Sequence, residues 1–257
     1  MSALALAALT VELGGKRVLD GVDASVGRGE WVALIGPNGA GKSTLLRAVA
    51  GLVAYQGSVT VDGLDAARLR RRALARRIAF VPQAPHLPPG MRVQEYVLLG
   101  RTPHTGPFGY EGPHDLDAVR LALERLGLTE LAERPLRTLS GGEQQRAVLA
   151  RAIAQDAPFL LLDEPTASLD LGRQQQALDL VSGLRERGEL TVLCAMHDLT
   201  LAGQYANRLL LLSHGRLVAE GPPSEIATEA LIATHYGAEV RVVEHEGGIA
   251  VIPVRRR

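Results

Sequence analysis

The chain of 257 residues contains little cysteine, little lysine and few aromatic side chains. Its one cysteine, Cys194, excludes an internal disulfide framework and fits a reducing compartment, so we expect a small, buried apolar side chain. The 28 basic and 28 acidic residues cancel, which excludes a global field that would attract nucleic acid or an acidic surface. Aromatic residues make up 4% of the chain, which argues against a base-stacking platform.

Long apolar runs are also missing. None approaches the roughly 18 residues that a membrane helix requires, so we expect a soluble chain that acts at a membrane only through other chains. The apolar start, MSALALAALT, lacks a basic segment and is short for a secretory signal, so it is interpreted as an edge strand. The hydrophobic content of 46% is ample for the core of one large domain or two small ones.

Lysine occurs only at Lys16 and Lys42, and arginine fills every other basic position. Lys42 therefore indicates a site that requires a compact, rotatable point charge. It lies in a stretch that fits G-x-x-x-x-G-K-[ST], between an apolar strand and a helical pattern, and this is the pattern of a phosphate-binding loop. The loop, followed by Thr44, consists of Gly36, Pro37, Asn38, Gly39, Ala40, Gly41, Lys42 and Ser43.

The chemistry of this loop suits a nucleotide. Its glycines allow backbone geometry that directs consecutive N–H groups inward, and the following helix adds its positive N-terminal end. Lys42 would reach the β- and γ-phosphates, Ser43 would coordinate Mg²⁺, and Thr44 would bond an α-phosphate oxygen. An ordinary glycine-rich turn is the alternative, and the flanking strand, the flanking helix and the rare lysine argue against it.

Two adjacent carboxylates follow the apolar stretch FLLL at 159–162. Neighbouring side chains of a strand point to opposite sides, so Asp163 can hold the Mg²⁺ hydration shell while Glu164 faces the attacking water. Such a pair is often only a solvated turn. Unpaired carboxylates at the end of a fully apolar strand would be costly, which favours the functional interpretation.

The stretch LSGGEQQR at 139–146 predicts the start of a helix. Ser140 can be the N-cap and Glu143 its partner in a capping box. Gly141 and Gly142 leave the N–H groups of the first turn uncovered, which makes an anion site. A chain with a phosphate loop needs only one cradle for each nucleotide, so a second cradle implies a nucleotide held between two sites.

With these motifs in this order, the sequence resembles the ATP-binding cassette (ABC) family over nearly its whole length. The resemblance rests on the loop at 36–43, Gln83, LSGGE at 139–143, LLLDEP at 160–165, SLD at 168–170 and His197 in MHD. It implies an α/β P-loop NTPase with a RecA-like parallel-sheet core, an antiparallel β subdomain and a helical subdomain. The single ATPase domain would span 1–257, with the core and antiparallel part in 1–83 and 158–257, and the helical subdomain in 84–157.

The resemblance also implies a head-to-tail dimer that binds ATP and Mg²⁺ between two copies. The loop of one copy would face the signature residues Ser140, Gly141, Gly142 and Glu143 of the other. Glu164 would be the general base, His197 would contact the γ-phosphate, and Gln83 would touch Mg²⁺ or water. Asp170 would communicate between the two sites. The family usually stacks adenine on an aromatic side chain where this chain has Leu13, so Val18 is expected to pack on the base.

Two further stretches narrow the resemblance. LLGR-x-PH at 98–104 and HYGAEVRVV at 235–243 are similar to the ATPases of bacterial importers for iron–siderophores, haem and vitamin B12. This implies two permease subunits, an extracytoplasmic binding protein, no nucleic-acid partner, and a peripheral position at the cytoplasmic face of the plasma membrane. The permease would contact roughly Gln83–Pro107. The sequence leaves the cargo open among these chelates, and a metal ion is a further alternative.

Two other function classes stay open at this point. A cassette ATPase acting on DNA or the ribosome could use the basic run RLRRRALARR at 68–77, although a solvated helix face is the simpler interpretation. A small kinase or GTPase is disfavoured by the Ser-Gly-Gly-Glu helix start. His104 and His114 could suggest a metal site, but two histidines in a Pro- and Gly-rich loop are more typical of solvated surface.

Overall fold

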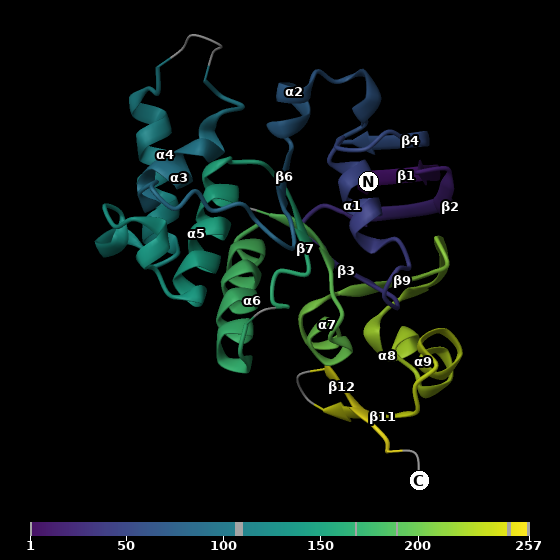
Figure 1. Cartoon of the computed structure of the whole chain (residues 1–257). Coiled ribbons are helices and arrows are strands. Elements are labelled where there is room, and N and C mark those ends of the chain that lie inside the picture. Colours follow the sequence, from purple (N-terminus) through teal and green to yellow (C-terminus); the bar gives the residue numbers. More distant parts are fainter. Residues whose placement is uncertain (1, 106–109, 168, 189, 246–247, 256–257) are drawn as a thin grey trace. The chain divides into compact units, whose positions relative to one another are not determined.

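The computed structural model describes residues 2–105, 110–167, 169–188, 190–245 and 248–255 (Figure 1). The chain divides into two compact units, one formed by residues 1–68 with 191–257 and the other by residues 69–190. Within the described ranges, every helix is too short or too polar to cross a bilayer.

An antiparallel sheet with the strand order β2-β1-β4-β5 forms part of the first unit. Strand β1 (Ser2–Leu13) pairs with both β2 (Lys16–Gly27) and β4 (Gln56–Val61), and the short β5 (Leu64–Asp65) continues from β4. The prediction that the chain begins with an edge strand was therefore wrong. The buried Leu4, Leu6 and Leu9 explain the central position, because an apolar strand of this length would aggregate through an open edge.

The first unit also contains three parallel strands and one antiparallel strand of a second sheet. β3 (Trp31–Ile35) lies between β8 (Thr191–Ala195) and β9 (Arg208–Ser213), and β10 (Arg216–Gly221) returns antiparallel to β9. All residues of β3 and β8 are buried, including Cys194 as predicted, since parallel strands carry continuous apolar runs. The hairpin of β9 and β10 turns at His214 and Gly215, with φ of 49° and 77°. Helix α1 (Lys42–Val49) follows β3, and α7 (Leu199–Tyr205) connects β8 to β9.

The C-terminal part of the first unit contains α8 (Pro223–Ile226), α9 (Glu229–Tyr236) and the hairpin of β11 (Val240–His245) and β12 (Gly248–Pro253). Thr228 separates the two helices and caps α9 by accepting from the Leu231 N–H at 3.3 Å. Strands β11 and β12 pair antiparallel, and residues 246–247 between them lie outside the described residues. This pair packs on α7 (Figure 1), where the Val251 N–H donates to Thr200 Oγ1 at 2.9 Å.

The second unit combines a parallel strand pair with helices. β6 (Ile78–Val81) pairs with β7 (Phe159–Asp163). The predicted helical stretch between them is confirmed as α3 (Val93–Leu98), α4 (Pro113–Arg125) and α5 (Gly141–Ala154), which pack on one another (Figure 1). Helix α6 (Leu171–Glu186) follows β7. Of the basic run at 68–77, only α2 (Arg71–Ala75) is α-helical, after a 3₁₀ turn at Ala66–Arg68.

Candidate functional site

The phosphate loop at 36–43 is shaped by two close backbone approaches in the first unit. Gly36 has φ of 149°, and a Cβ there would lie 2.1 Å from the Leu212 carbonyl oxygen. Gly41 has φ of 106°, and its Cβ would lie 2.7 Å from Leu19 Cδ2. The Gly215 N–H also donates to the Ala40 carbonyl at 3.1 Å, so the turn between β9 and β10 supports the loop. Glycine is required at both positions because any side chain would displace the loop.

Lys42 places its ammonium group inside the curve of this loop. The side chain is 5% exposed, and Nζ donates to the carbonyl oxygens of Gly36 at 2.8 Å and Pro37 at 3.3 Å. Helix α1 begins at this residue, with the half-buried Ser43 and Thr44 in its first turn. A cation, a helix N-terminus and a glycine cradle thus converge at one place, and this donor set fits the phosphates of a nucleotide.

The expected base-binding residues lie at different distances from the loop. The Val18 carbonyl oxygen would be 3.1 Å from a Cβ at Gly41, so the backbone of β2 adjoins the loop at the half-buried Val18. Leu13, where the resemblance leads us to expect an aromatic side chain, is 43% exposed at the end of β1. Val18 therefore adjoins the phosphate loop directly, whereas Leu13 presents an apolar surface to solvent.

Tyr236 is a loop neighbour that sequence reasoning missed. Burial raises the pKa of its hydroxyl, and the adjacent Gly36 backbone opposes that shift. The tyrosine lies on α9, far along the chain in HYGAEV, a stretch that the sequence singled out only for its resemblance to other ATPases. The exposed His197 also belongs to this unit, after β8 and directly before Asp198, which caps α7 by accepting from the Leu201 N–H at 2.9 Å.

The second unit brings together the predicted carboxylates and the predicted glutamine. Asp163 is fully buried at the end of β7, and Glu164 follows it half-buried. Gln83 Nε2 donates to Glu164 Oε2 at 2.7 Å, which fixes the carboxylate although the two residues lie 81 positions apart. Glu164 has φ of 49°, a left-handed conformation that is costly for a residue with a side chain and that is concentrated at functional sites.

Two glutamines that the sequence did not single out support the turn after Glu164. Gln145 Nε2 of α5 donates to the Pro165 carbonyl at 2.8 Å, and Gln174 Nε2 of α6 donates to the Thr166 carbonyl at 3.1 Å. Their only signal in the sequence is their place in the glutamine-rich stretches EQQR and RQQQ. The turn therefore depends on two helices that flank it in the sequence.

The predicted capping box at the start of α5 is confirmed. The Glu143 N–H donates to Ser140 Oγ at 3.4 Å, and the Ser140 N–H donates to Glu143 Oε2 at 2.7 Å. This backbone donor, with the Ser140 side chain, holds the pKa of the Glu143 carboxyl below its usual range. Ser140 and Gly141 are exposed, so the helix N-terminus is accessible to an anion.

Asp170 is connected with the start of α5 by the side chain of Arg173. It caps α6 by accepting from the Arg173 N–H at 3.0 Å, and its other oxygen pairs with Arg173 Nε at 3.2 Å. A Cβ at Gly142 would lie 3.1 Å from Arg173 Cδ. Arg173, which sequence reasoning missed, thus connects Asp170 with the glycines of the stretch at 139–146.

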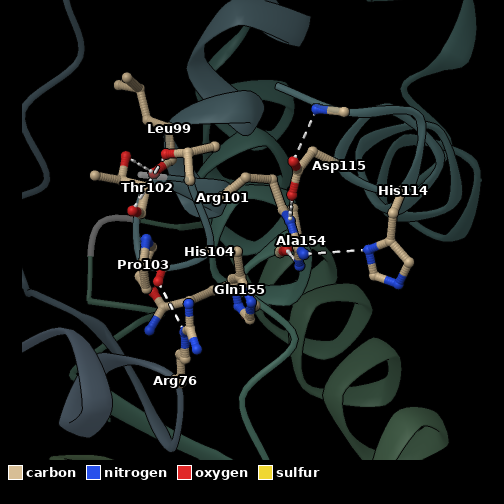
Figure 2. A network of polar contacts seen from close by, with 12 residues as sticks. Arg76, Leu99, Arg101, Thr102, Pro103, His104, His114, Asp115, Ala154 and Gln155 are labelled. Atoms are coloured by element: carbon tan, nitrogen blue, oxygen red, sulfur yellow. Dashed lines mark hydrogen bonds and ion pairs between the residues drawn. The ribbon is translucent and has the colours of Figure 1, made fainter. Parts of the chain in front are cut away.

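The histidines and the basic run differ from expectation. His104 is half-buried, and its Nε2 lies 2.8 Å from the Gln155 carbonyl oxygen, so the prediction of solvated surface was wrong for it. His114 is exposed as predicted, with Nδ1 3.4 Å from Arg101. In the basic run, Arg72 and Arg76 both donate to the Pro103 carbonyl oxygen, and Figure 2 shows the bond from Arg76. A compact loop at 101–105 accounts for these contacts, because its backbone carbonyls require donors.

Comparisons with known proteins find relatives that match most of this chain. A family model described as "ABC transporter" matches residues 19–167. The hemin import ATP-binding protein HmuV of Streptomyces coelicolor is 46% identical over 250 residues, which cover 96% of this chain and 88% of that protein. The cobalamin import ATP-binding protein BtuD of Halobacterium salinarum is 44% identical over 252 residues, or 97% of this chain. The match spans 63% of that relative's length.

A solved structure extends the comparison to the fold. It is described as an inward-facing conformation of a metal-chelate type ABC transporter, and it superposes with a TM-score of 0.86 at 29% identity. The match covers 100% of this chain and 99% of the chain in that structure. The predicted α/β cassette fold, with a mixed parallel sheet and an antiparallel β subdomain, is thereby confirmed.

Proposed function

Because the chain belongs to the ABC transporter family, we propose that it is the ATP-binding and ATP-hydrolysing subunit of a bacterial importer for a metal chelate. The observation that carries the enzymatic part is the carboxylate of Glu164, held by Gln83 at 2.7 Å directly after the buried Asp163. The cargo class is supported by the relatives that import hemin and cobalamin and by the metal-chelate transporter of similar fold. Iron–siderophores belong to the same chemical class.

The phosphate loop would bind the nucleotide. Lys42 Nζ already donates hydrogen bonds to the carbonyls of Gly36 and Pro37 inside the loop. When a nucleotide binds, anionic phosphate oxygens would replace these neutral acceptors, and hydrogen bonds between charged groups are stronger. The residues that would bind around the phosphates are Gly36, Pro37, Asn38, Gly39, Ala40, Gly41, Lys42, Ser43 and Thr44. Val18 would pack against the base.

Magnesium would be held by Ser43, Asp163 and Gln83. Hydroxyl, carboxylate and amide oxygens are the ligands that this ion prefers. When bound, Mg²⁺ would neutralise charge on the phosphates. The full burial of Asp163 fits a carboxylate that has a cationic neighbour in the working state.

Glu164 would act as the general base in hydrolysis. Its carboxylate would accept a proton from the attacking water. The hydrogen bond from Gln83 Nε2 to Glu164 Oε2 would fix the orientation of that carboxylate. His197 would contact the γ-phosphate and orient the attack. A positioned general base contributes typically about 10²–10⁴ in rate.

A second copy would complete each site. Ser140 and Gly141 are exposed at the start of α5, where the capping box leaves an accessible helix N-terminus. Ser140, Gly141, Gly142 and Glu143 of one copy would close on the γ-phosphate bound to the other copy in a head-to-tail dimer. Asp170 would communicate between the two sites through Arg173.

The remaining partners follow from the importer proposal. Two transmembrane permease subunits would contact the region Gln83–Pro107, and an extracytoplasmic binding protein would deliver the chelate. The chain would then sit at the cytoplasmic face of the plasma membrane as a peripheral subunit, with residues 84–157 as its helical subdomain. The nucleic-acid alternative is less well supported, because Arg72 and Arg76 of the basic run bind backbone carbonyls of the chain.

Isolation of the assembly tests the proposal. The tagged chain is purified from its native membranes in mild detergent, the partners are identified by mass spectrometry, and ATPase activity is measured with the binding protein and haem, cobalamin or a ferric siderophore. We expect a polytopic permease and stimulation by one chelate. The Glu164→Gln chain should assemble equally and show no stimulation. Recovery of soluble or nucleic-acid partners only would contradict the importer function.

A further inference from the structure

The C-terminal tail, defined here as α9 with the paired strands β11 and β12, is a connected part of the first unit (Figure 1). The Val242 N–H of β11 donates to Glu229 Oε1 at the start of α9 at 3.3 Å, and Arg241 Nε pairs with the same oxygen at 3.7 Å. The sequence motifs assign this tail no part in the nucleotide site. It nevertheless contacts two elements that carry proposed site residues, helix α7 beside His197 and the phosphate loop at Gly36.

The first contact fixes the beginning of α7. The Val251 N–H of β12 donates to Thr200 Oγ1 at 2.9 Å, and the same hydroxyl donates to the Val251 carbonyl oxygen at 3.4 Å. Thr200 is the second residue of α7, and Asp198 caps the helix by accepting from the Leu201 N–H at 2.9 Å. Strand β12 therefore bonds to the first turn of α7, three residues after His197.

Close packing along α7 strengthens this contact. Gly203 is buried, and a Cβ there would lie 2.2 Å from Ile249 Cγ1, so only glycine leaves room for that side chain. Ile249 is 2% exposed, which makes it part of the core of the unit. Gly248 has φ of 126°, and its Cβ would lie 2.7 Å from the Gly203 carbonyl oxygen. The two glycines thus bring β12 closer to α7 than side chains would allow.

This contact matters for His197 because the histidine is exposed and directly precedes the helix cap. The position of an exposed side chain depends on the backbone that carries it, and this backbone enters α7 within two residues. The other end of α7 also packs on the core, because the ring of Tyr205 lies 5.7 Å from that of Trp31 at the start of β3. A shift of the helix would therefore move His197 relative to the γ-phosphate that it is proposed to contact.

The second contact is made by Tyr236, the last residue of α9. Its hydroxyl is buried and makes no hydrogen bond of standard geometry with any described residue, and the Gly36 backbone is its polar neighbour. A buried hydroxyl without a partner lowers stability, so its presence at this place calls for a functional explanation. Gly36 opens the phosphate loop, and its backbone is already in tight contact with the Leu212 carbonyl oxygen. The hydroxyl is thus placed to hold the first residue of the loop.

Resting on the ATPase function proposed above, we propose that the C-terminal tail positions the nucleotide site at two points. Strand β12 sets the position of His197 through Thr200 and Ile249, which hold α7. Tyr236 supports Gly36, the first residue of the phosphate loop. The first contact should act on hydrolysis, because His197 is proposed to orient the attack. The second should act on nucleotide affinity, because the loop is proposed to bind the phosphates.

The contact with α7 is tested in the full chain by Thr200→Val, which removes the hydroxyl and keeps the shape of the side chain, and by Thr200→Ser, which restores the hydroxyl. Thr60→Val is the matched control, because Thr60 Oγ1 also donates to a backbone carbonyl, that of Ala5, at 3.4 Å in the same unit. We expect kcat to fall at least about fivefold in Thr200→Val and to recover in Thr200→Ser, with ATP affinity within about twofold in both. The fluorescence of Trp31, the one tryptophan of the chain, should change only in Thr200→Val, since its ring lies near Tyr205 of α7.

The contact with the phosphate loop is tested by Tyr236→Phe, which removes only the hydroxyl. Tyr55→Phe is the matched control, because the Tyr55 hydroxyl is also buried in this unit without a hydrogen bond to the described residues. Titration should show ATP affinity about fivefold lower in Tyr236→Phe, the effect of one hydrogen bond, with kcat at saturating ATP within about twofold. Tyr55→Phe should match the unaltered chain in both quantities.

Melting temperatures show whether each variant is folded. Ile249→Val, which removes one methyl group from the contact with Gly203, replaces Thr200→Val if that chain melts early. Unchanged kcat in the folded α7 variants overturns the role of β12, and unchanged or higher ATP affinity in Tyr236→Phe overturns the role of Tyr236. Equal losses of kcat and affinity in both sets would show general destabilisation and overturn the inference. Absence of ATP hydrolysis by the unaltered chain overturns the proposed function and this inference with it.

Discussion

The phosphate loop and the Gln83–Glu164 pair are built in different ways. The loop is contiguous, and Lys42 reaches carbonyls only five and six residues before it. The pair joins residues 81 positions apart, at the ends of two parallel strands. In the loop the backbone is critical, since a Cβ at Gly36 or Gly41 would collide with a neighbour. In the pair, the charge of the Glu164 carboxylate is the feature that the proposed mechanism requires. Substitutions should therefore separate backbone shape from carboxylate chemistry.

Glu164→Gln should have the largest effect on turnover. The amide keeps the size of the side chain but cannot accept a proton from water, so kcat should fall about 10²–10⁴-fold. ATP binding should be retained, because the phosphate loop is untouched. Phosphate release under saturating ATP measures kcat, and binding of a fluorescent ATP analogue measures affinity. Glu186→Gln, an exposed carboxylate on α6, is the control. Turnover near that of the unaltered chain would refute the role of Glu164.

Gly41→Ala should disturb the phosphate loop and leave the Gln83–Glu164 pair intact, the reverse of Glu164→Gln. Its φ of 106° and the 2.7 Å approach of Leu19 Cδ2 make a methyl group strained. We expect a loss of about 1–3 kcal/mol in the free energy of unfolding, together with weaker ATP binding. Gly90→Ala is the control, since no atom lies within 4 Å of its Cβ position. Urea denaturation and ATP titration give the two quantities, and equal behaviour of the two variants would contradict the strain argument.

The same division explains what the sequence could predict. Local patterns predicted the phosphate loop and the capping box of Ser140 and Glu143, because the residues of each motif are contiguous in the sequence. The central place of β1 was missed, since strand order depends on distant pairings. The contacts of His104, Arg173 and Gln145 were missed for the same reason. No periodicity in the sequence records which backbone carbonyl a distant side chain will reach.

Ser140→Ala should lower the stability of the chain less than Gly41→Ala does. Its main effect should be on assembly of the proposed dimer. Loss of the N-cap bond to the Glu143 N–H should lower the free energy of unfolding by about 1 kcal/mol. Ser140→Asp restores a capping oxygen but adds a negative charge where the γ-phosphate is proposed to bind. Thermal denaturation should show recovery in the aspartate variant, whereas its ATPase activity should stay low. Recovery of both would exclude a phosphate contact at this helix start.

Leu13→Tyr should give the smallest change and would sharpen the comparison at the base. An aromatic ring at this exposed position could stack on adenine and add about 1 kcal/mol, or about fivefold in ATP affinity. Leu52→Tyr is the control, because Leu52 is also exposed in the same unit. Isothermal titration with ATP and GTP measures both affinity and base preference. An equal gain for both tyrosines would show that Leu13 is not at the base.

The central claim is tested most directly by measuring how the molar mass of the chain in solution depends on ATP. The claim is that the phosphate loop of one copy and the Ser140 helix start of another enclose one nucleotide. Light scattering after gel filtration should show the Glu164→Gln chain as a monomer without nucleotide and at twice that mass with ATP and Mg²⁺. Adding Ser140→Arg should keep ATP binding and abolish the dimer. A Glu164→Gln chain that binds ATP but stays monomeric, or a Ser140→Arg chain that dimerises equally, would contradict the account.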